Sequence, residues 1–83
     1  MKVVVRYFAA VREALGPGED AQVADGADIA ALRDALVARG GRHAQALGRE
    51  RVLRAARNRV LAREATSLAD GDEVGFFPPL TGG

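Results

Sequence analysis

The chain has 83 residues, 48% of them hydrophobic, with no cysteine, no tryptophan and one histidine. This length allows one domain with a thin core, and the missing thiols exclude disulfides and the zinc or iron–sulfur sites that need several soft ligands. Twelve basic and eleven acidic residues leave a net charge of +1, which argues against a general nucleic-acid binder.

The N-terminal segment predicts two strands. Residues 2–8 are rich in valine and aromatic side chains, and their two-residue period places Val3, Val5 and Tyr7 on one face. Residues 19–24 predict a second, weaker strand that returns beside the first.

Two helical segments are expected in the first half of the chain. Residues 9–15 favour a short helical turn that ends at a Gly-Pro-Gly break. A clear amphipathic helix is predicted over residues 29–39, with Asp28 as its N-cap and with Arg33 and Asp34 pointing away from the buried stripe. The two glycines after this helix provide a stop.

The second half of the chain predicts short strands. After a polar connection that holds Leu47, residues 52–57 and 60–62 are predicted as strands around Asn58-Arg59. Residues 70–73, Asp-Gly-Asp-Glu, lack the spaced oxygen ligands of a calcium loop, so we interpret them as a turn. Residues 73–77 form the last predicted strand.

This order of elements indicates an α+β roll in which one main helix lies on a sheet. We divide the chain into a domain over residues 1–77 and an extended tail over residues 78–83. No stretch approaches the roughly 18 apolar residues of a membrane span, and the N-terminus lacks a signal-peptide pattern. We therefore expect a cytoplasmic protein that binds no membrane.

The single histidine, His43, has no serine or threonine near it in the sequence. We interpret it as structural or solvent-exposed rather than as a catalytic base.

The tail is the unusual part of the sequence. Pro78 and Pro79 end the last strand and stiffen the start of the tail, while Leu80, Thr81, Gly82 and Gly83 complete an arm with a slender tip. Six residues reach about 20 Å at 3.3–3.6 Å per residue. Such an arm can enter a narrow channel on another protein.

Two aromatic residues precede the arm, and both are candidates for docking to a larger partner. Neighbours on a strand alternate between faces, so at least one of Phe76 and Phe77 faces outward. We expect Phe76, in phase with Val74, to lie in the core.

The candidate reactive group is the α-carboxylate of Gly83. A carboxylate is a poor electrophile, but attack by its oxygen on the α-phosphate of ATP would give an acyl adenylate with a good leaving group. Side chains on the last two residues would crowd the nucleotide and the incoming nucleophile. That is a physical reason for glycine at Gly82 and Gly83.

Two blocks, VVRYFAAVRE over residues 4–13 and LADGDEVGFFPPLTGG over residues 68–83, resemble the family of molybdopterin synthase small subunits. The helix at 28–39 lies where that family has its main helix. The resemblance implies a ubiquitin-like β-grasp fold, with a mixed sheet of four to five strands and one main helix packed on one face.

The resemblance also implies a mechanism in molybdenum cofactor biosynthesis. An E1-like activating enzyme uses ATP to adenylate Gly83, and a persulfide sulfur donor converts the adenylate to a thiocarboxylate. The tail then gives its sulfur to cyclic pyranopterin monophosphate inside the large subunit, in a heterotetramer of two small and two large subunits. Catalytic side chains would belong mainly to the large subunit, and no cofactor is expected on the isolated chain.

Two other hypotheses stay open. Related β-grasp carriers deliver sulfur for thiamine or tRNA thiolation, or are conjugated to protein lysines. A non-reactive interaction module with the same fold is the third hypothesis. The basic segment Arg49–Arg63 is either a solvated sheet face or a surface that meets acidic groups on a partner.

Overall fold

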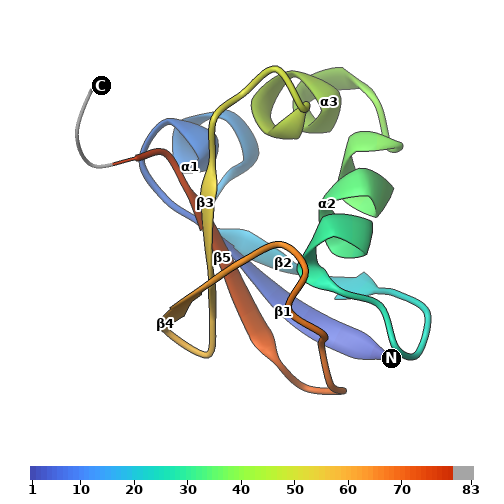
Figure 1. Cartoon of the computed structure of the whole chain (residues 1–83). Helices are drawn as coiled ribbons and strands as arrows, with labels where there is room; N and C mark the ends of the chain where they lie inside the picture. The colour runs from blue at the N-terminus through green and yellow to red at the C-terminus, as the bar shows by residue number, and fades with distance from the viewer. Residues whose placement is uncertain (80–83) are drawn as a thin grey trace.

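The computed structural model describes residues 1–79, and within them the chain forms one five-stranded sheet (Figure 1). The strand order across the sheet is β2-β1-β5-β3-β4. The strands are β1 (Lys2–Tyr7), β2 (Gly18–Gln22), β3 (Arg54–Arg57), β4 (Val60–Ala62) and β5 (Glu73–Phe77).

The two central strands, β1 and β5, run parallel, with Val5 opposite Val74. The remaining pairs are antiparallel: β1 with β2, β5 with β3, and β3 with β4. Because β1 and β5 run in the same direction, the chain leaves the sheet beside the end of β1. The mixed sheet with helices packed against it confirms the expected α+β roll.

Three helices occur in the described part of the chain, where one main helix was expected. They are α1 (Ala9–Leu15), α2 (Ile29–Val37) and α3 (Gly41–Leu47). Asp28 caps α2 as predicted, since its Oδ1 accepts a hydrogen bond of 2.8 Å from the Ala31 N–H. Gly40 and Gly41, with φ of 74° and 54°, reverse the chain after α2.

The expectation of a polar connection around Leu47 was wrong, because this segment forms α3. Only Leu47 is buried among the seven residues of α3, so the sequence carries no repeating apolar stripe that would reveal a helix. Strand β3 also begins later than predicted, at Arg54, and leaves Val52 exposed.

The core lies between the sheet and the helices. Its fully buried large side chains come from β1, β5 and the helices; they are Val3, Val5, Tyr7, Ile29, Leu32, Leu47, Val74 and Phe76. Strand alternation therefore predicted the inward faces of β1 and β5 correctly. Within residues 1–79, no helix has the length and hydrophobicity needed to cross a bilayer.

Candidate functional site

The predicted site lies in the tail, of which the structure describes the base. Pro78 and Pro79 come directly after β5 and are half-buried. Leu80, Thr81, Gly82 and Gly83 lie outside the described residues, so their predicted roles remain predictions. The structure defines the surface from which the tail starts.

An aromatic pair marks this base. The rings of Phe8 and Phe77 meet edge to face, with centroids 6.4 Å apart and planes at 83°. The Phe8 N–H donates to the Phe76 carbonyl at 3.1 Å, which holds the end of β1 against the end of β5. Phe8 keeps 44% of its surface exposed, so the pair presents apolar area to solvent.

Gly75 makes room for this pair. A Cβ at Gly75 would lie 3.0 Å from a ring carbon of Phe8, a distance at which the ring must move. Phe8 therefore lies over the backbone of β5, because Gly75 has no side chain to occupy that space.

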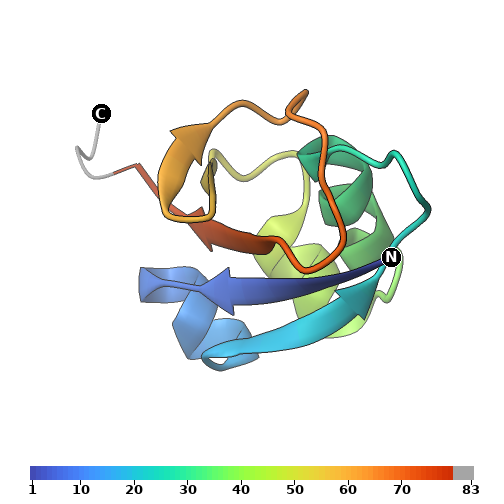
Figure 2. The same ribbon diagram turned by 90° about the horizontal axis from the view of Figure 1, so that it is seen from below.

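The aromatic pair continues into a patch on the face of the sheet turned away from the helices. Figure 2 views the molecule from the side on which α2 and α3 lie behind the strands. Ala56 and Leu61 are register partners on β3 and β4, and since Ala55 points into the core, both face outward. We call Phe8, Phe77, Ala56 and Leu61 the outer-face patch; Arg54, the register partner of Phe77, flanks it.

The two candidate docking aromatics have different positions. Phe76 is 1% exposed and packs in the core, as expected from its phase with Val74. A side chain this buried offers no surface to a partner, so of the two only Phe77 can serve in docking.

At the other end of β5, a polar network holds the turn. Asp72 accepts hydrogen bonds from the Ala69 N–H at 2.8 Å, from Asn58 Nδ2 at 3.0 Å and from Arg57 Nε at 2.8 Å. The Ala69 N–H contributes most, followed by Asn58, and together these donors lower the pKa of Asp72 to about 2. Gly71, with φ of 86°, completes the turn. The turn predicted from residues 70–73 is confirmed.

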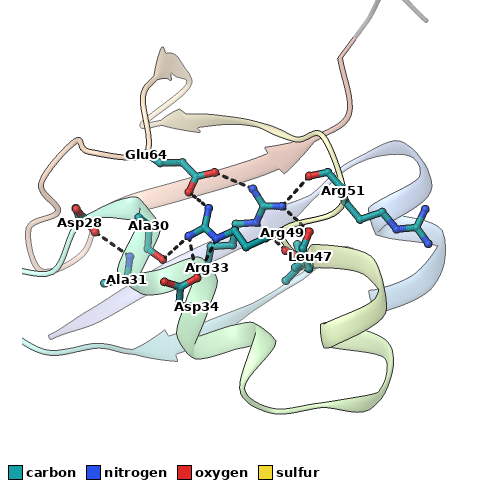
Figure 3. A network of polar contacts seen from close by, with 10 residues as sticks. Asp28, Ala30, Ala31, Arg33, Asp34, Leu47, Arg49, Arg51 and Glu64 are labelled. Carbon is teal, nitrogen blue, oxygen red and sulfur yellow. Dashed lines mark hydrogen bonds and ion pairs between the residues drawn. The ribbon is translucent and has the colours of Figure 1, made fainter. Parts of the chain in front are cut away.

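A second network centres on Arg33, which was wrongly expected to point away from the core. Its side chain is 3% exposed and its guanidinium holds four acceptors (Figure 3). Nε donates to the Leu47 carbonyl at 2.7 Å, Nη2 to the Gly48 and Arg51 carbonyls at 2.8 and 2.9 Å, and Nη1 to Glu64 Oε2 at 2.7 Å. Carbonyls at the end of a helix lack partners inside it, and a cation placed there satisfies them. Arg33 thus fixes the end of α3 and the segment after it.

Part of the basic segment is used inside the fold. Arg49 bonds Asp34 and Glu64, and Arg57 bonds Asp72, so neither residue matches a purely solvated face. Burial favours a higher pKa of Glu64, but the hydrogen bonds from Arg49 and Arg33 outweigh it and lower that pKa.

His43 has the structural position that the sequence suggested. Its Nε2 lies 2.7 Å from Glu19 Oε2, and the same oxygen accepts a hydrogen bond from the Tyr7 hydroxyl at 2.7 Å. Burial favours a higher pKa of Glu19, but hydrogen bonds from His43, Arg39 and Tyr7 reverse that effect and lower the pKa to about 2. Glu19 was not singled out in the sequence, because its partners lie at least 12 residues away.

No cluster of three or more His, Cys, Asp or Glu side chains suited to a metal ion occurs among residues 1–79. In the described residues, the base of the tail therefore combines the outer-face patch with Pro78 and Pro79.

Relatives of known role match the chain over nearly its whole length. A protein from Escherichia coli named molybdopterin synthase sulfur carrier subunit is 43% identical over 81 residues, which cover 98% of this chain and 99% of that protein. A Mycobacterium tuberculosis protein of the same name is 40% identical over 85 residues, covering 100% of this chain and 99% of that one.

Solved structures share the fold. A putative molybdopterin converting factor subunit 1 from Pyrococcus furiosus is 30% identical with a TM-score of 0.80, covering 96% of this chain and 99% of its own. SAMP1 from Haloferax volcanii is 27% identical with a TM-score of 0.79 and full coverage of both chains. A complex of subunits 1 and 2 of the molybdopterin-converting factor from Helicobacter pylori contains a chain that is 30% identical, with a TM-score of 0.68 and full coverage of both chains.

The ThiS family pattern matches residues 5–83. Together with relatives that are 37–43% identical along nearly the whole chain, this match shows that the protein belongs to the ThiS family, with a ubiquitin-like β-grasp fold.

Proposed function

We propose that this protein is the sulfur carrier subunit of a molybdopterin synthase and that the carboxyl group of Gly83 carries the sulfur. The observation that carries the proposal is the 43% identity, along nearly the full length of both chains, to a protein named for that role. The base of the tail supports it, because β5 leads directly into Pro78-Pro79 beside the outer-face patch.

The chemistry proceeds in three steps. An oxygen of the Gly83 carboxylate attacks the α-phosphate of ATP in an E1-like activating enzyme, and pyrophosphate leaves. The terminal sulfur of a persulfide donor attacks the acyl carbon and displaces AMP, and a thiol then cleaves the S–S bond to release the thiocarboxylate. In this scheme ATP belongs to the activating enzyme, and the chain itself holds no cofactor.

We propose that the large subunit of molybdopterin synthase supplies the pocket in which the thiocarboxylate meets cyclic pyranopterin monophosphate, in an assembly of two small and two large subunits. The Helicobacter pylori neighbour, solved as a complex of subunits 1 and 2, supports a partner of this kind.

The outer-face patch is the proposed docking surface for that large subunit. The aromatic pair next to the tail, in which Phe8 is exposed and Phe77 is half-buried, gives apolar anchors of the type that dominate interface energies. Phe77 connects the docking surface with the tail, because it belongs to the outer-face patch and directly precedes Pro78.

Intact-mass analysis tests the proposal. The protein is incubated with ATP, an activating enzyme, a persulfide donor and a thiol, and the mass of the intact chain is expected to increase by the replacement of one oxygen by sulfur. Omission of ATP should abolish the gain. A chain that stays unchanged while a related carrier is loaded in the same mixture would contradict the proposal.

A protein-modifier role is the second candidate, and the likeness to SAMP1, which is also described as a small archaeal modifier protein 1, favours it. The two roles share the activated carboxyl group and differ in the acceptor. Lysine-linked adducts of the chain in its source cells indicate a modifier, whereas a stable complex with a pterin-binding partner indicates the carrier.

A further inference from the structure

The two edge strands of the sheet differ in charge. At one edge β2 carries Glu19 and Asp20, whereas β4 at the other edge lies between Arg59 and Arg63. An open edge presents unpaired backbone N–H and C=O groups, to which a further strand can pair. Leu61 on β4 is 69% exposed, so this edge also has apolar surface that a partner can cover.

The register of the sheet shows which backbone groups of β4 point outward. The Asn58 N–H donates to the Glu73 carbonyl at 2.7 Å, and bonded positions alternate along an antiparallel pair, so Ala56 also bonds toward β5. Leu61 is the register partner of Ala56 on the other side. Its N–H and C=O therefore point away from β3, and a partner strand can exchange two backbone hydrogen bonds with them.

A hollow lies across the ends of β3 and β4, with a volume of about 520 Å³. Leu53, Leu61 and Ala62 supply its apolar surface, and Arg54 and Arg63 also line it. The hollow thus offers a place for an apolar side chain directly beside the open edge.

The charge around this hollow favours an acidic partner. Its one carboxylate, Glu64, is already paired with two arginines inside the fold. Arg54 and Arg63 are exposed, and neither forms an ion pair with any of residues 1–79. Carboxylates on a partner would therefore meet two cations that the described fold does not use.

The open edge leads to the base of the tail. Ala55 is the register partner of both Ala62 at the end of β4 and Phe76 near the end of β5, so the two strands end level with each other (Figure 2). Leu61 also belongs to the outer-face patch. One partner can therefore cover the patch and pair with the edge.

We propose that the large subunit of molybdopterin synthase adds an extended segment to β4, which bonds the Leu61 backbone, places an apolar side chain in the hollow and sets carboxylates beside Arg54 and Arg63. The choice of partner rests on the proposed function. Because β4 has only three residues, the segment gains few hydrogen bonds, and we expect each change at the edge to weaken binding by about threefold to tenfold.

The charges argue against a second copy of this chain as the occupant. The acidic edge strand β2 would have to supply the carboxylates, but both are already engaged. Glu19 accepts a hydrogen bond from the Tyr7 hydroxyl at 2.7 Å, and an Asp20 oxygen lies 3.7 Å from the Lys2 Nζ.

Amide hydrogen exchange tests the pairing. In the free chain the Leu61 amide is open to water, and in the complex with the large subunit we expect it to exchange about tenfold more slowly or slower still. An unchanged rate in the complex would overturn the proposal. A rate in the free chain that falls as the protein concentration rises would identify a second copy as the occupant and would also overturn it.

Leu61→Pro provides the decisive variant, with Leu61→Ala as its matched control. Proline lacks the outward N–H and is tolerated on edge strands, whereas alanine removes the side chain and keeps the donor. By calorimetry, Leu61→Pro should bind the large subunit about threefold to tenfold more weakly than Leu61→Ala. Equal binding by two variants that are folded, as urea unfolding shows, would overturn the proposal. If Leu61→Pro does not fold, the exchange measurement decides alone.

Charge reversal tests the contact with carboxylates. Arg63→Glu should weaken binding about fivefold at low ionic strength and less as salt is added. Arg42→Glu makes the same change on an exposed residue of α3 and should leave the affinity within about twofold. Equal affinities of the two variants would refute the charged contact.

The unmodified chain separates the two proposals. A large subunit that does not bind the unmodified chain would reject the proposed function. Binding that neither protects the Leu61 amide nor responds to these substitutions would reject only the added strand.

Discussion

At its first residue strand β5 is tied into a polar network, whereas its last residue packs against an aromatic ring and is followed by two prolines. Around Glu73, Asp72 accepts hydrogen bonds from Arg57, Asn58 and Ala69, and Asn58 Oδ1 accepts one from the Glu73 N–H. Around Phe77 the contacts are those of the Phe8 ring. The comparison teaches that the chain uses directed hydrogen bonds where a loop must stay in place and leaves apolar surface at the proposed docking patch.

Deletion of Gly82-Gly83 gives the largest expected effect. Sulfur loading should fall to background, because the shortened chain ends in the crowded side chain of Thr81. The free energy of unfolding should change by less than about 0.5 kcal/mol, because the deletion removes no residue of the described fold, residues 1–79. Loading by intact mass and urea unfolding measure the two effects. Retained loading would show that the two terminal glycines are not required.

The neighbours Phe76 and Phe77 should separate stability from binding. Phe76→Ala empties a core position and is expected to cost about 3–5 kcal/mol. Phe77→Ala removes the edge-to-face pair and should cost only about 0.5–1.5 kcal/mol. Its main effect should be weaker binding of the large subunit, measured by calorimetry. Unchanged binding in Phe77→Ala would remove the outer-face patch from the proposal.

Arg33→Ala tests the polar network that holds α3. The change strips donors from three carbonyls and a salt-bridge partner from Glu64, so we expect a loss of roughly 2–4 kcal/mol. This loss of stability is expected to be smaller than for breaking a fully buried ion pair, because Arg49 still neutralises Glu64. Urea unfolding measures the loss, and Arg33→Lys should restore only part of it. Arg63→Ala, on an exposed residue, is the control and should change stability by less than about 0.5 kcal/mol.

The smallest effect should come from titration of the turn before β5. Because the fold lowers the pKa of Asp72 from 3.8 to about 2, the unfolded chain binds more protons between these values. The stability that Asp72 contributes is therefore present above about pH 4 and is lost as the pH falls toward 2. Asp72→Asn should flatten this part of the pH profile of urea unfolding. Glu19 titrates in the same range, so the difference between the two proteins isolates Asp72. If stability changed with pH equally in the unmodified chain and in Asp72→Asn, the proposed contribution of Asp72 to stability would be contradicted.

Local patterns predicted much of this protein. Alternation along residues 2–8 and 73–77 identified the buried faces of β1 and β5, because a strand facing one core repeats every two residues. The Asp28 cap and the turn over residues 70–73 could also be predicted from the sequence, since each depends on neighbours within a few positions. Helix α3 was missed because it buries one residue only.

The strand faces, the helix cap, the family and the composition of the tail could all be derived without coordinates, since they depend on neighbouring residues or on identity along the chain. Tertiary structure alone decided that Arg33 is buried, that Glu19 joins His43 to Tyr7, and that Phe8 covers Gly75. The reason is that a buried cation or carboxylate is stable only where distant groups supply its partners. For Arg33 one such partner, Glu64, lies 31 residues away along the chain.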